Sequence, residues 1–172
     1  TNWDNLRFET EPSYQVVEVK DGVLSLAGDQ TLSVLHVEDV STGCKYDIPV
    51  VAKSSYEVGL VTKAYTDSTI TIGVLNEYEH LQFRVLWQNT RTSEGIEYGQ
   101  YDSVATIKIE PAWRNSKGRT FIRVFAMGDG KQLNDLLIPL ENGKVVACAD
   151  ELTRFDDHAQ ILYSLMIDRF KN

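Results

Sequence analysis

The sequence predicts an all-β fold, and three observations lead to this prediction. Short runs rich in β-branched and aromatic residues recur from residue 14 to about residue 140, at spacings of roughly 8 to 14 residues. Gly, Asp, Asn or Ser separates these runs, and such residues favour turns because they tolerate positive φ or bond their own backbone. Several runs alternate between apolar and polar residues, which is typical of a strand with one buried face.

Taken in chain order, the runs predict these strands: Tyr14–Val19, Val23–Ala27, Thr31–Val37, Tyr46–Ala52, Tyr56–Ala64, Thr69–Leu75, Leu81–Gln88, Val104–Ile109, Thr120–Met127 and Leu136–Leu140. Turns are predicted at Asp21-Gly22, Gly28-Asp29, Thr42-Gly43, Gly128-Asp129-Gly130 and Asn142-Gly143. In Leu81–Gln88 the odd positions form one apolar face, so Trp87 is expected to face a core.

Two parts of the β region differ in size. Residues 54–145 have the length, the strand number and the core Trp of an immunoglobulin-like or fibronectin-like β-sandwich. Residues 1–53 carry further strands in too short a length for a comfortable core of their own. They form either a β extension that packs on the sandwich or strands of one larger sandwich, and the sequence leaves both open.

Composition and charge exclude several function classes. The 172 residues include 17 Lys or Arg and 25 Asp or Glu, which gives a net charge of −8 and disfavours binding to nucleic acid. No apolar run reaches about 18 residues, so insertion into a membrane is not expected. Cys44 and Cys148 stand far apart without neighbouring ligands, and we expect two buried free thiols or one long-range bridge. The three His residues have no metal-type spacing, His36 is expected to be a satisfied core side chain, and no cofactor or metal motif is present.

The C-terminal part of the chain has a different pattern. Residues 159–167 are nearly continuously apolar, which suits a strand buried on both faces. The same residues recur at helical spacing, and Asp156 or Asp157 could cap a helix. Periodicity alone therefore predicts either a helix or a strand for this segment.

The segment Ile161–Asn172, with Asp168-Arg169-Phe170 near its end, closely resembles the first strand of the catalytic (β/α)8 barrel in the α-amylase superfamily of glycoside hydrolases. Three preceding segments are similar to the last strands of the immunoglobulin-like domain that stands before the barrel in starch- and maltodextrin-degrading members: Gly118–Ala126, Asn134–Leu140 and Asn142–Val145. Together the matches cover residues 118–172.

The resemblance implies that residues 146–172 are a linker and the start of a truncated barrel. The catalytic carboxylates of the family lie downstream of this position, so no catalytic residue is expected in this chain. The implied function is that of a non-catalytic accessory module, whose partners are its own barrel, α-glucan, or a second copy of the chain through the exposed C-terminal segment. The bacterial cell envelope, the periplasm or the exterior is the implied location. The alternative from another class is a stand-alone ligand-binding or adhesive β-sandwich.

Candidate site residues follow from these expectations. Aromatic rings in polar loops can stack on sugars, and this predicts carbohydrate contacts for Trp113, Tyr98 and Tyr101. Contacts between domains are predicted for residues that face outward on a strand, Phe121, Arg123 and Phe125, and, by the resemblance, for Asp168, Arg169 and Phe170.

Overall fold

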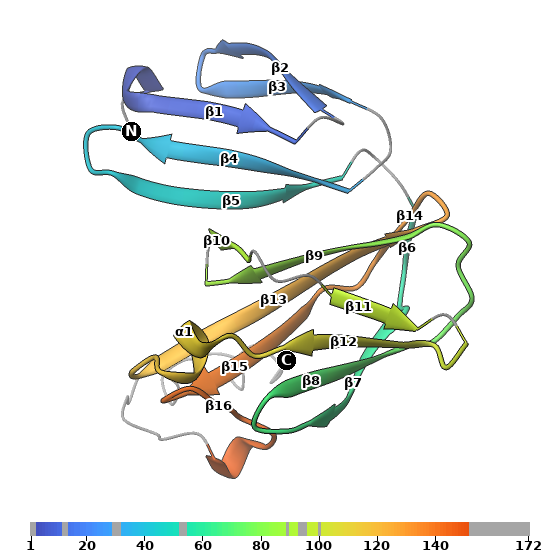
Figure 1. The fold of residues 1–172 in the computed structure, drawn as a ribbon. Helices are drawn as coiled ribbons and strands as arrows, with labels where there is room; N and C mark the ends of the chain where they lie inside the picture. Colours follow the sequence, from blue (N-terminus) through green and yellow to red (C-terminus); the bar gives the residue numbers. More distant parts are fainter. Residues whose placement is uncertain are drawn as a thin grey trace, which may run out of the picture.

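The computed structural model describes residues 3–11, 14–28, 32–51, 55–88, 90–92, 96–99 and 101–151. Antiparallel β-sheets make up most of this part of the chain, so the predicted all-β, sandwich-like fold is confirmed. Figure 1 shows two layers of sheet in the lower part of the molecule and a smaller group of N-terminal strands above them. No helix of the described residues has the length and apolar character that a membrane crossing requires.

The sandwich is built from two facing sheets. The larger sheet contains β6 (Ser55–Glu57), β9 (Leu81–Trp87), β10 (Thr90–Arg91), β13 (Arg119–Gly128), β14 (Lys131–Leu133), β15 (Leu136–Glu141) and β16 (Lys144–Val145). The smaller sheet has the order β11 (Ile96–Gly99), β12 (Val104–Lys108), β8 (Thr69–Val74) and β7 (Leu60–Tyr65). Between β12 and β13 lies the short helix α1 (Pro111–Arg114), and the 3-10 helix η2 (Ala149–Glu151) follows β16.

Alternation along the strands forms the core of the sandwich. Ile70 and Ile72 of β8 are fully buried, as are Ile122 and Val124 of β13 in the opposite sheet. Two sheets that bury such alternating apolar residues against each other form a sandwich core. The Trp87 ring packs against this core, as the alternation in its strand predicts.

The N-terminal strands form sheets of their own. After the 3-10 helix η1 (Trp3–Asn5), they are β1 (Leu6–Thr10), β2 (Tyr14–Lys20), β3 (Val23–Gly28), β4 (Ser33–Asp39) and β5 (Cys44–Val50). One sheet has the order β1-β4-β5, and β2 pairs with β3 in a hairpin. Among the described residues, none of these strands pairs with a strand of the sandwich.

Tight turns connect several hairpins as the sequence predicts. Asp21 and Gly22, Asp129 and Gly130, and Asn142 and Gly143 all have positive φ, between 49° and 78°. Two consecutive residues with positive φ are the requirement of a type I′ turn, whose twist matches that of the flanking strands. The sequence predicts a turn at each of these three residue pairs, and the positive φ values confirm it.

The predicted strand Tyr56–Ala64 is divided, because its two halves belong to different sheets. Exposed Val58 and buried Gly59 separate β6, in the larger sheet, from β7, in the smaller sheet. Asn134 holds this crossing: Gly59 N and Leu60 N donate to Asn134 Oδ1 at 2.9 Å each, and Asn134 Nδ2 donates to the Leu60 carbonyl at 3.0 Å.

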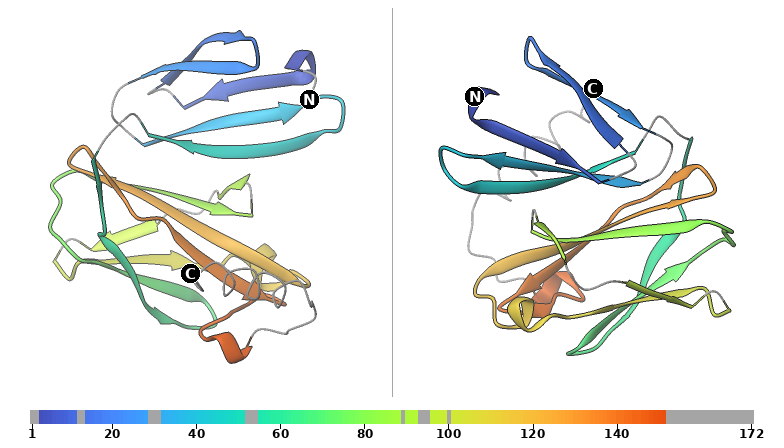
Figure 2. Two further views of the ribbon diagram at one scale, coloured as in Figure 1. Left: turned by 180° about the vertical axis from the view of Figure 1, so that it is seen from behind. Right: turned by 45° about the horizontal axis from the view of Figure 1, so that its top comes forward.

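An ionic contact joins the N-terminal strands to the sandwich. Glu11, directly after β1, is 9 % exposed, and its Oε2 lies 3.0 Å from Nε and 2.9 Å from Nη2 of Arg84 on β9. Arg91 of β10 pairs with the other oxygen of Glu11, and its backbone N–H donates to Asp47 of β5. Both views of Figure 2 place the N-terminal strands over the β9–β10 side of the sandwich.

Candidate functional site

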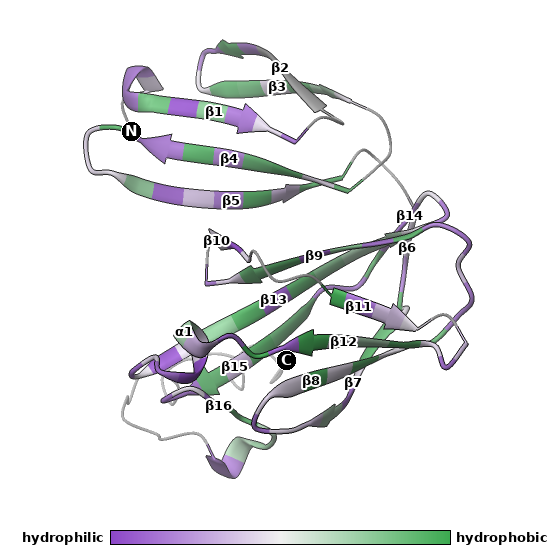
Figure 3. Ribbon diagram, viewed as in Figure 1, coloured by the Kyte–Doolittle hydropathy of each residue, from purple (hydrophilic) through white to green (hydrophobic). Residues whose placement is uncertain are grey.

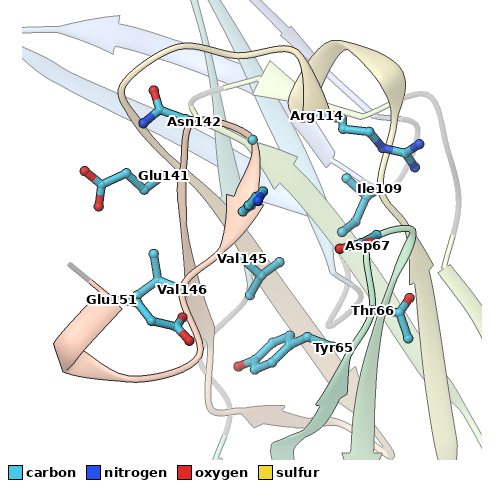
Figure 4. Close-up of a pocket in the computed structure, with 12 residues that line it drawn as sticks. Tyr65, Thr66, Asp67, Ile109, Arg114, Glu141, Asn142, Val145, Val146 and Glu151 are labelled. Atoms are coloured by element: carbon cyan, nitrogen blue, oxygen red, sulfur yellow. The ribbon is translucent and has the colours of Figure 1, made fainter. Parts of the chain in front are cut away.

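A pocket of about 930 Å³ opens at the end of the sandwich where the chain leaves β16. Figure 4 shows side chains from three separate parts of the chain around it. They come from the end of β7 and the turn that follows it, from the stretch between the end of β12 and the end of α1, and from β15 to η2. The lining residues are Tyr65, Thr66, Asp67, Ile109, Arg114, Glu141, Asn142, Gly143, Lys144, Val145, Val146 and Glu151.

One wall of the pocket is the hairpin turn between β15 and β16. Asn142 N donates to the Gly118 carbonyl and Gly118 N donates to Asn142 Oδ1, both at 2.9 Å. Gly143 lies against the backbone of Arg114, so closely that a Cβ at this position would be 1.9 Å from the Arg114 carbonyl oxygen. The turn is therefore fixed against α1, and the wall of the pocket is rigid.

The opposite wall is the turn between β7 and β8. Thr66 N donates to the Thr69 carbonyl at 2.9 Å, while Thr66 Oγ1 accepts from Ser68 N at 3.2 Å and from Thr69 N at 2.9 Å. Ile109 N also donates to the Ser68 carbonyl at 2.8 Å. These bonds fix the backbone beside Asp67, whose side chain lines the pocket.

The lining combines apolar and polar groups. Tyr65, Ile109, Val145 and Val146 supply apolar surface. Around it stand three carboxylates, two cationic side chains and one amide: Asp67, Glu141, Glu151, Arg114, Lys144 and Asn142. Such a mixture of apolar surface and a few fixed polar groups is typical of small-molecule sites.

The structure contradicts the sugar contact predicted for Trp113, because the ring is not available. Trp113 is 1 % exposed and its ring stacks on Trp87 with centroids 6.5 Å apart. The cause is α1: Pro111 starts a single helical turn, in which Trp113 N and Arg114 N donate to the Glu110 carbonyl at 3.1 Å. This turn directs the indole into the core. Pro at the first helical position was the signal in the sequence that could have indicated the turn.

The two tyrosines that the sequence predicts as carbohydrate contacts, Tyr98 and Tyr101, lie outside the pocket. Tyr98 on β11 is half-buried, and its ring lies 5.9 Å from the ring of Phe83. Tyr101, in the turn between β11 and β12, is fully exposed. Tyr98 therefore stands on a strand and not in the polar loop that the sequence predicts.

The outward face of β13 carries the predicted contact residues. Phe121, Arg123 and Phe125 are half-buried on the side of the strand that faces away from the core. Arg123 Nη2 lies 2.8 Å from Asp135 Oδ2, and the guanidinium stands 4.8 Å from the centre of the Phe125 ring. Leu137, which pairs with Arg123 in the sheet, is 62 % exposed. Figure 3 shows the hydrophobic character along β13 and β15.

The remaining predicted contact residues, Asp168, Arg169 and Phe170, lie outside the described residues, as does the predicted helix or strand over 159–167.

Two further expectations are wrong in detail. His36 is partnered, as expected, with its Nδ1 at 2.6 Å from Asp47 Oδ1, but it is part-exposed and not a core side chain. Cys44 and Cys148 are free, yet both are exposed, whereas the sequence predicted buried thiols or a bridge. Cys44 is exposed because β5 is at the edge of its sheet, and Cys148 because it lies beyond the last strand.

A second polar cluster lies at the other end of the sandwich, around Glu57 of β6. Lys131 Nζ donates to Glu57 Oε2 at 2.8 Å, Asn76 Nδ2 donates to Oε1 at 3.1 Å, and the Tyr78 hydroxyl donates to the same oxygen. Gly59 and Gly128 leave room for the Tyr78 side chain, because a Cβ at either position would be 2.5 Å from it. The cluster joins β6 to β14 and to the segment after β8, and we assign it a structural role.

The hydrogen bonds at Glu57 predict a loss of stability in acid. Lys131, followed by Tyr78, lowers the pKa of Glu57 from the usual 4.5 to about 2. A carboxyl group whose pKa is lowered by folding stabilises the protein above its unfolded pKa and stops doing so as the pH falls through its folded pKa. The free energy of unfolding should therefore decrease as the pH falls from about 4.5 to about 2.

Urea denaturation across this pH range, together with an NMR titration of Glu57, measures the effect. Lys131→Met removes the largest cause, so the pKa of Glu57 should rise toward 4.5. Lys108→Met removes the same charge from an exposed pair with Glu97 and should leave Glu57 unchanged. An equal pKa in wild type and Lys131→Met would contradict the assignment.

Comparisons with protein-family models, with curated proteins and with solved structures find no match. Within the part of the chain that the structure describes, no group of three or more His, Cys, Asp or Glu side chains is placed to hold a metal ion. The features that bear on function are therefore the pocket, the outward face of β13 and the sequence.

Proposed function

We propose that this chain is the non-catalytic N-terminal accessory module of an α-amylase-like glycoside hydrolase, and that it packs on the catalytic barrel and binds α-glucan. The observation that carries the proposal is the run Ile161–Asn172, whose aliphatic residues and Asp168-Arg169-Phe170 resemble the first strand of that barrel. Catalysis belongs to carboxylates at the ends of later barrel strands, so the module itself hydrolyses nothing.

The two facing sheets supply the described part of the sandwich core. The core residues among those described come from 60–145. The chain then passes through η2, at 149–151, beyond the last strand. The proposal assigns the apolar residues of 161–170 to the core of the domain that follows.

The outward face of β13 is the surface that we assign to the contact with the barrel. Its end near Phe121 pairs with Pro139 of β15, and exposed Leu137 stands beside Arg123. Its other end carries Phe125, paired in the sheet with Arg84, which contacts Glu11 of the N-terminal strands. The end near Phe121 lies on the strands that lead to the pocket and to η2. The proposal places the barrel after η2 in the chain. Exposed apolar surface of this kind is characteristic of contacts between domains.

Removal of residues 152–172 tests the proposal. If the segment belongs to another domain, a chain of residues 1–151 should have a free energy of unfolding within about 1 kcal/mol of the full chain. If the segment were part of the sandwich core, each lost Leu or Ile would cost about 2–5 kcal/mol. Urea denaturation of both chains distinguishes these results, and a large loss of stability would contradict the proposal.

Activity provides the second arm of the test. The chain of 172 residues should release no sugar from soluble starch. The longer product of the same reading frame should hydrolyse it. A reading frame that ends at Asn172 would instead favour the stand-alone ligand-binding sandwich.

A further inference from the structure

The pocket between the β7–β8 turn and the β15–β16 hairpin has a ring, fixed polar groups and enough volume for a ligand, and no role has been assigned to it so far. We propose that it binds a short neutral oligosaccharide, with Tyr65 as the stacking ring. The identity of the sugar, an α-1,4-glucan, rests on the proposed function. The residues of the pocket by themselves indicate that the ligand is an oligosaccharide.

The ring and the apolar floor are the first argument. Tyr65, at the end of β7, is half-buried, and Figure 4 shows its ring extending across the pocket toward the side where Glu151 lies. Val145 and Val146 provide further apolar surface beside it. A pyranose has an apolar C–H face that covers such a ring, while its hydroxyl groups remain at the edges and need polar partners.

The polar rim is the second argument. Hydroxyl groups both donate and accept, so they are best recognised by carboxylates together with cationic donors. Asp67 and Glu151 stand on opposite walls, and Arg114 adds a planar group of donors. The Glu151 side chain is oriented by the backbone of Ala147, because Ala147 N donates to Glu151 Oε2 at 2.8 Å. This carboxylate is thus positioned before a ligand arrives.

The charge of the rim excludes other ligand classes. The lining residues include three carboxylates and two cationic side chains, so a phosphate or another anion would meet excess negative charge. The carboxylates do not gather into a group that could hold a metal ion among the described residues. A purely apolar ligand would bury these charged groups without partners, which is costly. A neutral ligand rich in hydroxyl groups satisfies the ring and the rim together.

Pocket walls that are already fixed favour binding, because the protein then loses less conformational entropy when the ligand binds. The close contact of Gly143 with Arg114 and the Thr66 hydrogen bonds fix both sides of the opening. The volume of about 930 Å³ lies within the usual range of small-ligand sites.

NMR and calorimetry on the 172-residue chain test the inference, with maltoheptaose as the probe. Binding should shift the backbone amides of residues 65–67 and 141–146. Tyr65→Ala should weaken the affinity at least tenfold, which is about 1.4 kcal/mol. Tyr56→Ala, which removes an exposed ring of β6 outside the pocket, is the matched control and should bind as the wild type does.

Tyr65 also packs against the core, so its replacement could reduce folding. Asp67→Asn, at an exposed position of the same rim, is the second variant and should weaken binding severalfold without a change in melting temperature. Wild-type binding with shifts confined to Tyr98 and Tyr101, or unchanged affinity in a folded Tyr65→Ala, would overturn the assignment.

Two further outcomes separate the pocket from the proposed function. No shift on addition of maltoheptaose or cellohexaose overturns the pocket assignment, while the accessory role is judged by the truncation and the reading frame. Shifts of the pocket amides with cellohexaose but not with maltoheptaose would support an oligosaccharide pocket and contradict the α-glucan function.

Discussion

Gly143→Ala should destabilise the sandwich by about 3 kcal/mol or more, because the change combines two costs. Gly143 has a φ of +78°, in the left-handed region that side chains other than Gly rarely adopt. A Cβ at this position would also lie 1.9 Å from the backbone oxygen of Arg114 and 2.4 Å from its carbonyl carbon. Backbone atoms cannot rotate away as a flexible side chain can, so the β15–β16 hairpin or α1 must shift.

Gly118→Ala is the matched control for this prediction. Gly118 has almost the same φ, +73°, in the same sandwich, but a Cβ there would meet nothing within 4 Å. Its replacement should therefore cost only the backbone strain, about 1 kcal/mol. Urea denaturation of the two variants isolates the cost of the collision with Arg114, and equal losses would show that the contact is absent.

The same substitution links the fold to the pocket. If the hairpin moves away from Arg114, the wall that contains Asn142 and Val145 moves with it. A folded Gly143→Ala protein should then bind maltoheptaose more weakly than Gly118→Ala does. Measuring both stability and binding for this pair of variants tests the geometry and the function of one turn.

The sequence allowed the strands and turns to be predicted where the determinants are local. Alternation in Leu81–Trp87 is visible in the residues themselves, and so are the Asp-Gly and Asn-Gly pairs that formed tight turns. The division between β6 and β7 is different. It depends on Asn134, 75 residues from Gly59, whose amide bonds both sides of the crossing. No pattern within residues 56–64 reveals a partner at that distance.

The candidate site was hidden from sequence reasoning for the same reason. The pocket combines a turn near residue 66, a segment near residue 110 and a hairpin near residue 143, and none of these has a binding motif. Sequence reasoning instead favoured Trp113 because its neighbours are polar. Those neighbours are indeed exposed, but one turn of helix after Pro111 directs the ring into the core. Polarity of a loop predicts exposure of its backbone better than exposure of its largest side chain.

Glu11→Ala should cost about 3 kcal/mol and loosen the N-terminal strands from the sandwich. Glu11 is 9 % exposed and is placed between Arg84 and Arg91, so its removal leaves two positive charges close together without their partner. Leaving Arg84 unpaired should cost more stability than leaving Arg91 unpaired. Burial lowers the pKa of Arg84, which means that its surroundings disfavour the charged form. Removing one partner of a buried ion pair destabilises a protein more than replacing both partners with apolar residues.

Glu9→Ala is the control, since Glu9 lies two residues earlier and is exposed, and it should change stability by no more than about 0.5 kcal/mol. Replacing Glu11, Arg84 and Arg91 together by Gln, Met and Met should recover part of the loss, because no buried charge is then left unpaired. Calorimetry of the single, control and triple variants separates these cases. A Glu11→Ala protein as stable as Glu9→Ala would mean that the two arginines find water or other partners, and that the ionic contact does not hold the N-terminal strands to the sandwich.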